Sequence, residues 1–157
     1  MPWFKDTIFI IVADHCAGSA RKIALPIKNY EIPLIVYAPA LLKAEKIDRM
    51  MSQIDIAPTI LGMLNISYSS KFFGRDIFND KDGPERAFIG TYQKLGYIED
   101  DKLLILDSGR RTEFFSFARN SGIAVKAAAD ENLLLNGLAY YQGSDFAYKQ
   151  RLNRSNL

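Results

Sequence analysis

Two short apolar runs constrain the fold of this chain more than any other feature of its sequence. Residues 7–13 read TIFIIVA and residues 32–38 read IPLIVYA, and both are rich in β-branched and aromatic side chains. Their apolar residues follow one another without alternation, which is typical of strands buried on both faces, as in a central parallel sheet. The intervening residues 14–31 are long enough for a crossover connection. We therefore expect two parallel neighbours in a covered α/β sheet.

A helix is predicted next, within the sequence SQIDIAPTILGMLN at residues 52–65. Pro58 is tolerated there only in the first helical turn, where backbone amides have no intrahelical partner. Asp55, three residues earlier, is a natural N-cap, and we favour that role over a catalytic one. The helix would bury one apolar stripe, formed by Ile56, Ile60, Met63 and Leu64.

The chain changes character near residue 84, after a segment rich in turn-forming residues. The later runs RAFIGTYQ, YIED, DKLLILDS and TEFFSFAR predict short antiparallel strands, with hairpin turns at 99–101 and 107–109. The apolar spacing from Ile123 to Tyr141 predicts an amphipathic helix, weakened at Gly137. We therefore divide the chain into residues 1–84, the end of an α/β sheet, and residues 85–157, a small antiparallel sheet with a closing helix and a polar tail.

Composition excludes several classes of protein. With 157 residues, 48% of them hydrophobic, the chain can bury a core of ordinary domain size. The formal charge of +2 is too small for a nucleic-acid groove, and Lys149, Arg151 and Arg154 read as a solvated tail. No apolar run is long enough to span a membrane, and no signal peptide is visible. Cys16 is the only cysteine, so no internal disulfide can form.

Asp14 and His15 are the strongest candidates for chemistry. They directly follow the first apolar run, and functional groups of open α/β sheets gather beyond the carboxyl ends of the strands. A buried strand would hold the pair rigidly, and two adjacent ligands at its tip can bracket one cation. A carboxylate with an imidazole suits manganese or zinc better than calcium.

The pair alone leaves a structural alternative open, namely a capped strand end with a hydrogen-bonded histidine. A catalytic metal normally has three or more protein ligands, and His15 is the only histidine in the chain. The sequence contains no glycine-rich phosphate loop, and no serine or cysteine lies in a nucleophile-elbow pattern.

Several segments taken together resemble a known family. DTIFIIVADHC at residues 6–16 resembles the strand and metal-binding Asp-His pair of the sulfatase and alkaline phosphatase superfamily. YEIPLIVYAP at 30–39 resembles the next segment of its sulfatase branch. SQIDIAPTILGMLNISY at 52–68, followed by FFGRDIF at 72–78, is similar to one subgroup, the lipoteichoic acid synthase-like phosphoglycerol transferases. GTYQKLGYI at 90–98 is consistent with the C-terminal subdomain of that family.

The resemblance implies a fold and a reaction. The fold would be the C-terminal part of an alkaline-phosphatase-like covered sheet, followed by the small antiparallel sheet and closing helix. A divalent cation, manganese first and zinc, magnesium or calcium as alternatives, would activate a threonine that accepts phosphoglycerol from a lipid-linked donor and passes it to a hydroxyl acceptor. Asp14 and His15 match two of the metal ligands. The nucleophile, another ligand and a membrane anchor would precede residue 1, so no catalytic nucleophile is assigned here. Cys16 would be a tolerated small residue beside the site.

The resemblance also leaves alternatives. Sulfate-ester hydrolysis and phosphoethanolamine transfer are close competitors within the superfamily. The resemblance places the parent protein on the extracytoplasmic side of the bacterial cell membrane, with this chain itself soluble and inactive alone. The alternative from another class is a non-catalytic, truncated module that associates with itself through an exposed sheet edge.

Overall fold

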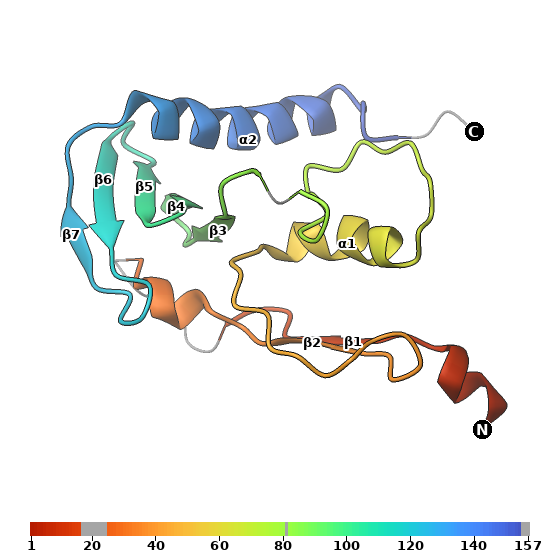
Figure 1. Ribbon diagram of the computed structural model, residues 1–157. Helices are drawn as coiled ribbons and strands as arrows, with labels where there is room; N and C mark the ends of the chain where they lie inside the picture. Colours follow the sequence, from red (N-terminus) through yellow and green to blue (C-terminus); the bar gives the residue numbers. More distant parts are fainter. Residues whose placement is uncertain (17–24, 81, 155–157) are drawn as a thin grey trace.

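The computed structural model describes residues 1–16, 25–80 and 82–154, and α2 runs along one side of its larger sheet while the β1–β2 pair lies on the other side (Figure 1). The elements of these residues, in chain order, are the 3-10 helix η1 (Pro2–Asp6), β1 (Phe9–Val12), η2 (Ile27–Tyr30), β2 (Leu34–Tyr37), η3 (Gln53–Asp55), α1 (Ile56–Met63), β3 (Arg86–Gly90), β4 (Lys94–Glu99), β5 (Lys102–Asp107), β6 (Thr112–Phe117), β7 (Ala124–Lys126) and α2 (Glu131–Lys149). They confirm the predicted fold class: an α/β chain with a small first sheet, an antiparallel second sheet and a closing helix.

The first two strands correct the predicted strand direction. β1 and β2 pair antiparallel, with Val12 opposite Leu34, so the expectation of parallel neighbours was wrong. Neither strand is buried on both faces, because Ile11 and Ile35 remain 59% and 53% exposed. The described part of the connection forms no crossover helix. It instead sends Leu25 and Ile27 into the core of the five-stranded sheet.

The helix α1 confirms the predicted start and corrects the role of one residue. Asp55 immediately precedes α1 and Pro58 lies in its first turn, as the sequence predicts. The Asp55 side chain makes no capping bond to α1. It accepts hydrogen bonds from the backbone amides of Ser52 and Arg75, both at 2.9 Å, and forms a buried ion pair with Arg86.

The five-stranded sheet is a simple antiparallel meander in the order β3-β4-β5-β6-β7. The short apolar runs predict antiparallel strands for β3 to β6 but not for β7. Its central strands are buried on both faces. Ile98, Leu103 and Ile105 face a cluster that contains Leu25 and Ile27, and Tyr97 and Leu104 face α2. Asp100 adopts a φ of 54° in the β4–β5 turn, a left-handed conformation that Asp tolerates in tight hairpins.

The closing helix begins later than its apolar spacing indicates. Residues 124–126 form the edge strand β7, and α2 begins at Glu131, so the predicted helix over 123–141 was wrong in its first turns. Asp130 explains the new start, because its carboxylate accepts the backbone amide of Leu133 at 3.0 Å as an N-cap. The Lys102 amine, which donates to Asp130, holds the pKa of that carboxyl below its usual range, with help from the Leu133 amide.

The division near residue 84 stays a prediction, and contacts cross it. Leu25 and Ile27 pack with Ile89, and Asp55 pairs with Arg86. Among the described helices, none combines the length and apolar character that a membrane crossing requires. The predicted polar tail continues from α2 through residue 154, and residues 155–157 lie outside the described part.

Candidate metal-binding site

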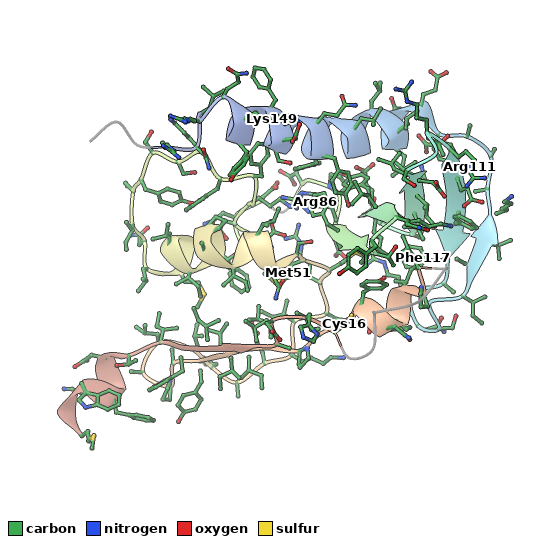
Figure 2. The ribbon with its side chains drawn as sticks, turned by 180° about the vertical axis from the view of Figure 1, so that it is seen from behind. Cys16, Met51, Arg86, Arg111, Phe117 and Lys149 are labelled. Atoms are coloured by element: carbon green, nitrogen blue, oxygen red, sulfur yellow. The ribbon has the colours of Figure 1, made fainter. Side chains whose placement is uncertain are left out.

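Asp14 and His15 lie directly after β1, where the sequence predicts them. Figure 2 labels their neighbour Cys16 at the end of the β1–β2 pair that is nearer the five-stranded sheet. The two side chains point into solvent, with 90% of the Asp14 side chain and 75% of the His15 side chain exposed. Cys16 in contrast is buried. The chain therefore passes from exposed to buried side chains between Asp14 and Cys16.

The histidine ring has a defined orientation. Its Nδ1 lies 2.9 Å from the backbone oxygen of Cys16. Because a carbonyl oxygen can only accept, Nδ1 donates in this contact, and in the neutral ring Nε2 then carries the lone pair. Metal-binding histidines are oriented in the same way by a hydrogen bond from the other ring nitrogen.

The second donor lies close to that free nitrogen. His15 Nε2 and Asp14 Oδ2 are 3.7 Å apart, while Asp14 Oδ1 accepts the backbone amide of His15 at 3.0 Å. Nitrogen and oxygen ligands bind zinc-like cations at about 2.0–2.2 Å, so two donors that share one ion lie at most about 4.4 Å apart. The separation of Oδ2 and Nε2 therefore fits two coordination positions of a single cation.

The pair does not complete a metal site by itself. Across residues 1–16, 25–80 and 82–154, no group of three or more His, Cys, Asp or Glu side chains is arranged to hold a metal. A catalytic cation needs at least one further protein ligand. The described part of the chain thus supplies two ligands of the right chemistry and spacing.

Gln53 is the functional candidate that sequence reasoning missed. Its side-chain amide nitrogen donates to the backbone oxygens of Ala13 and Asp14, at 2.8 and 3.1 Å. Gln53 lies in η3, far along the chain from the strand end that it contacts. A lone glutamine in a polar stretch has no pattern that predicts this contact. Only the packing of η3 against the end of β1 brings the three residues together.

Cys16 contributes its backbone rather than its thiol to the geometry. It is 7% exposed, and its carbonyl oxygen holds the His15 ring. Tyr30 lies near it: burial raises the pKa of the Tyr30 phenol, and the electrostatic influence of Cys16 acts in the same direction. The prediction that Cys16 is a tolerated small residue stays a prediction.

A second charged cluster, Asp55 with Arg86, joins η3 to β3. Asp55 and Arg86 are 1% and 2% exposed, and Arg86 Nη2 lies 3.0 Å from Asp55 Oδ1. Arg86, labelled in Figure 2, also donates to the carbonyl of Phe73, and its guanidinium lies 4.7 Å from the ring centroid of Tyr140. Both residues are buried between elements, so this cluster holds the structure together rather than binding a ligand.

Comparison with known proteins agrees with this arrangement. Residues 4–66, which include β1, the Asp-His pair and α1, match the sulfatase family model. The whole chain is similar to a solved structure of a protein in the alkaline phosphatase superfamily from Vibrio parahaemolyticus, with a TM-score of 0.89 and 26% sequence identity. The fold is alkaline-phosphatase-like. The similarity covers 98% of this chain but only 38% of the Vibrio chain, so this chain spans well under half of that relative.

The two matches support a relationship to the sulfatase and alkaline phosphatase superfamily, but they do not assign a subgroup within it. The sulfatase match covers the segments that carry the Asp-His pair, and the alkaline-phosphatase-like fold extends over both sheets and α2. Neither match distinguishes phosphoglycerol transferases from other branches of the superfamily.

Proposed function

We propose that this chain is the C-terminal part of a metal-dependent sulfatase-family enzyme, in which Asp14 and His15 hold a divalent cation. The observation that carries the proposal is the 3.7 Å separation of Asp14 Oδ2 and His15 Nε2, with both side chains exposed at the end of β1. The sulfatase match over residues 4–66 supports it independently. Manganese is the expected cation, and zinc, magnesium or calcium are alternatives.

The residues of this chain would have two tasks. The Asp14 carboxylate and the His15 imidazole would occupy two coordination positions, and the carbonyl of Cys16 would keep the proton on Nδ1 so that Nε2 stays available. A cation bound there would polarise a phosphoryl oxygen and lower the pKa of a coordinated hydroxyl. Because both side chains are exposed, a substrate oxygen would reach the cation without any movement of the described residues.

The reaction we favour is transfer of phosphoglycerol. By resemblance, a threonine hydroxyl forms a bond to the phosphorus of a lipid-linked donor, the bond from phosphorus to the lipid oxygen breaks, and the lipid alcohol leaves with the threonine proton. An acceptor hydroxyl on an envelope polymer or glycan then displaces the threonine in the same way. No residue of this chain matches that threonine, so we expect the chain alone to be inactive, and the parent enzyme to act on the extracytoplasmic side of the bacterial membrane.

The test is substitution of the pair in the protein that carries this chain together with its upstream region. We expect Asp14→Ala and His15→Ala each to abolish manganese-dependent release of the lipid alcohol while the circular dichroism spectrum is retained. Asp48→Ala is the matched control, because Asp48 is an exposed carboxylate in the same half of the chain, and it should leave the rate unchanged. Near-normal turnover by either site variant would overturn the assignment.

Two other reactions compete within the superfamily. Sulfate-ester hydrolysis would require a cysteine or serine nucleophile that matures to formylglycine, whereas transfer of phosphoglycerol or phosphoethanolamine requires threonine. Reading the coding sequence upstream of Met1 decides between the first and the other two. Assay of the purified protein with phosphoglycerol, phosphoethanolamine and sulfate-ester donors decides among all three.

A non-catalytic module is the second candidate function. Two observations favour it. The described residues supply no third ligand beside Asp14 and His15, and β1 and β2 expose apolar side chains. Such a module would fold and associate without turning over any substrate.

A further inference from the structure

The backbone carbonyls of Ala13 and Asp14 accept hydrogen bonds from a side chain that lies outside β1. The Gln53 side-chain amide carries two hydrogens, and the structure aims its nitrogen at two successive carbonyls, Ala13 O at 2.8 Å and Asp14 O at 3.1 Å. Two bonds from one planar amide fix the orientation of the peptide between these residues. The direction in which the Asp14 side chain leaves the backbone is therefore fixed as well.

The short helix that carries Gln53 is itself closely tied. Ser52 and Asp55, which flank the turn, form a capping box in which the Ser52 amide donates to Asp55 Oδ2 at 2.9 Å. The Ser52 hydroxyl oxygen also accepts the backbone amide of Phe88 in β3, at 3.0 Å. Gln53 thus extends from a turn that is anchored at both ends.

The anchor continues into the core of the five-stranded sheet. Asp55 Oδ1 accepts Arg86 Nη2 at 3.0 Å and the backbone amide of Arg75 at 2.9 Å. Both partners of the Asp55–Arg86 pair are almost fully buried, and Arg86 belongs to β3. A buried ion pair with several hydrogen bonds has little freedom to move. Through this pair and Ser52, hydrogen bonds connect β3 to the turn that carries Gln53, and Gln53 connects that turn to the end of β1.

We propose that Gln53 is a positioning residue for the Asp14–His15 pair, holding Oδ2 and Nε2 at the spacing that one divalent cation requires. The inference rests on the proposed function, since it assigns Gln53 to the same metal-binding pair. Outer partners of metal ligands commonly change metal affinity by about 10–100-fold when they are removed. We expect Gln53→Met, which keeps the size of the side chain and removes its donor, to weaken manganese binding by about 10-fold.

The experiment is a manganese titration of the protein that carries this chain together with its upstream region, followed by nuclear magnetic resonance, because the described residues supply only two of the ligands that a cation needs. Paramagnetic broadening of the His15 ring signals reports cation binding directly and requires no turnover. The carbonyl carbon shifts of Ala13 and Asp14 report the two hydrogen bonds in the absence of metal. Gln53→Ala is a second variant in case Met packs differently. Gln142→Met is the matched control, because Gln142 is an exposed glutamine in α2.

The expected result has two parts. In the wild type and in Gln142→Met, low manganese concentrations broaden the His15 signals selectively. In Gln53→Met and Gln53→Ala, the Ala13 and Asp14 carbonyl shifts move and the same broadening requires about 10-fold more manganese. A residue that only stabilised the fold would lower the unfolding midpoint without changing the titration of the folded state.

Two results would overturn the inference, and they are distinguishable. If the Gln53 variants respond to the same manganese concentration as the wild type, Gln53 does not position the pair, and the proposed metal site stands. If the wild type shows no selective broadening at His15, the metal site of the proposed function fails, and the role of Gln53 fails with it.

Discussion

At the scale of single residues, the fully buried charges of the described part of the chain form one ion pair, Asp55 with Arg86. Asp55 and Arg86 are almost completely removed from solvent, and Arg86 Nε and Nη1 are buried without a hydrogen-bond partner in the described part of the chain. The aromatic rings of Tyr140 and Phe88, at 4.7 and 5.4 Å from the guanidinium carbon, supply part of the missing stabilisation through cation–π contact. Arg86 therefore depends strongly on the Asp55 charge.

We expect Asp55→Asn to lower the free energy of unfolding by about 3 kcal/mol or more, because it leaves a buried guanidinium without its counter-charge. Urea unfolding followed by circular dichroism measures this loss. Asp145→Asn is the control: Asp145 pairs with Lys149 on the exposed surface of α2, so its removal should cost no more than about 0.5 kcal/mol. Equal effects of the two substitutions would contradict the assignment of the buried pair.

Tyr141 provides a pH-dependent test of the packing under α2. Burial raises the pKa of its phenol to about 12, and its hydroxyl donates to the carbonyl of Gly96 at 2.8 Å. A phenol in an unfolded chain has a pKa near 10, so the stability that folding gains by keeping Tyr141 neutral is complete below about pH 10. It is lost as the pH rises toward 12.

We therefore expect Tyr141→Phe to be less stable than the wild type at pH 8 by about 1 kcal/mol, the value of one hydrogen bond. The difference should shrink above about pH 10 and reverse in sign before pH 12, since each pH unit in this window removes about 1.4 kcal/mol from the wild type and phenylalanine cannot ionise. Urea midpoints measured across this range provide the comparison. A gap that stays constant with pH would show that Tyr141 does not titrate in this window.

At the scale of elements, α2 packs closely against the five-stranded sheet at Gly137. A Cβ atom there would lie 2.6 Å from Leu104 Cδ2 and 3.3 Å from Tyr97 Cβ. The sequence indicates only that glycine weakens a helix at this point. The structure shows why it is needed, because the helix backbone packs directly onto the buried side chains of β4 and β5.

Two glycine substitutions in α2 separate packing from helix propensity. Gly143→Ala should raise the free energy of unfolding by about 0.5–1 kcal/mol, because the new Cβ meets only Phe73 Cε1 at 3.8 Å. Gly137→Ala should lower it by about 1–3 kcal/mol, since the clash with Leu104 exceeds the gain in helix propensity. Thermal or urea unfolding measures both. Stabilisation by both substitutions would show that α2 lies farther from the sheet.

Element boundaries were predicted well where local signals are strong. The strands between residues 86 and 117 and the start of α1 follow from short apolar runs, turn residues and the position of Pro58. The start of α2 was predicted too early, because apolar spacing cannot distinguish a helix from an edge strand over the few residues of β7. Pairing with β6 decides that segment.

At the scale of the whole molecule, the β1–β2 pair is the least covered part of the chain. Among the described residues each strand pairs along one edge only, and Ile11 and Ile35 are cross-strand partners on an exposed face. A two-stranded sheet with exposed apolar faces is marginally stable alone and offers a surface for association. This chain covers 38% of the length of its Vibrio relative. The association expected below therefore concerns the isolated chain, not a longer protein in which other segments cover the first sheet.

We expect the isolated chain to associate with itself at micromolar concentrations, as measured by sedimentation velocity. The double substitution Ile11→Lys with Ile35→Lys should return it to a monomer, because it places charges on the exposed face of the pair. Val125→Lys is the control, since Val125 lies on the exposed edge strand β7 and is 62% exposed. A wild type that stays monomeric at every concentration would contradict self-association, and loss of association in Val125→Lys alone would place the contact at β7.

The sequence by itself determined the features that depend on near neighbours. These are the four short strands β3 to β6 and their turns in outline, the position of α1, and the chemistry of Asp14 and His15 at a strand end. Only the tertiary structure decided the antiparallel pairing of β1 with β2, the burial of Asp55 with Arg86, and the contact of Gln53 with the backbone of Ala13 and Asp14. The physical reason is the same for all three: each joins residues far apart in the chain, and the periodicity of apolar residues reports which face of an element is buried but not against which partner.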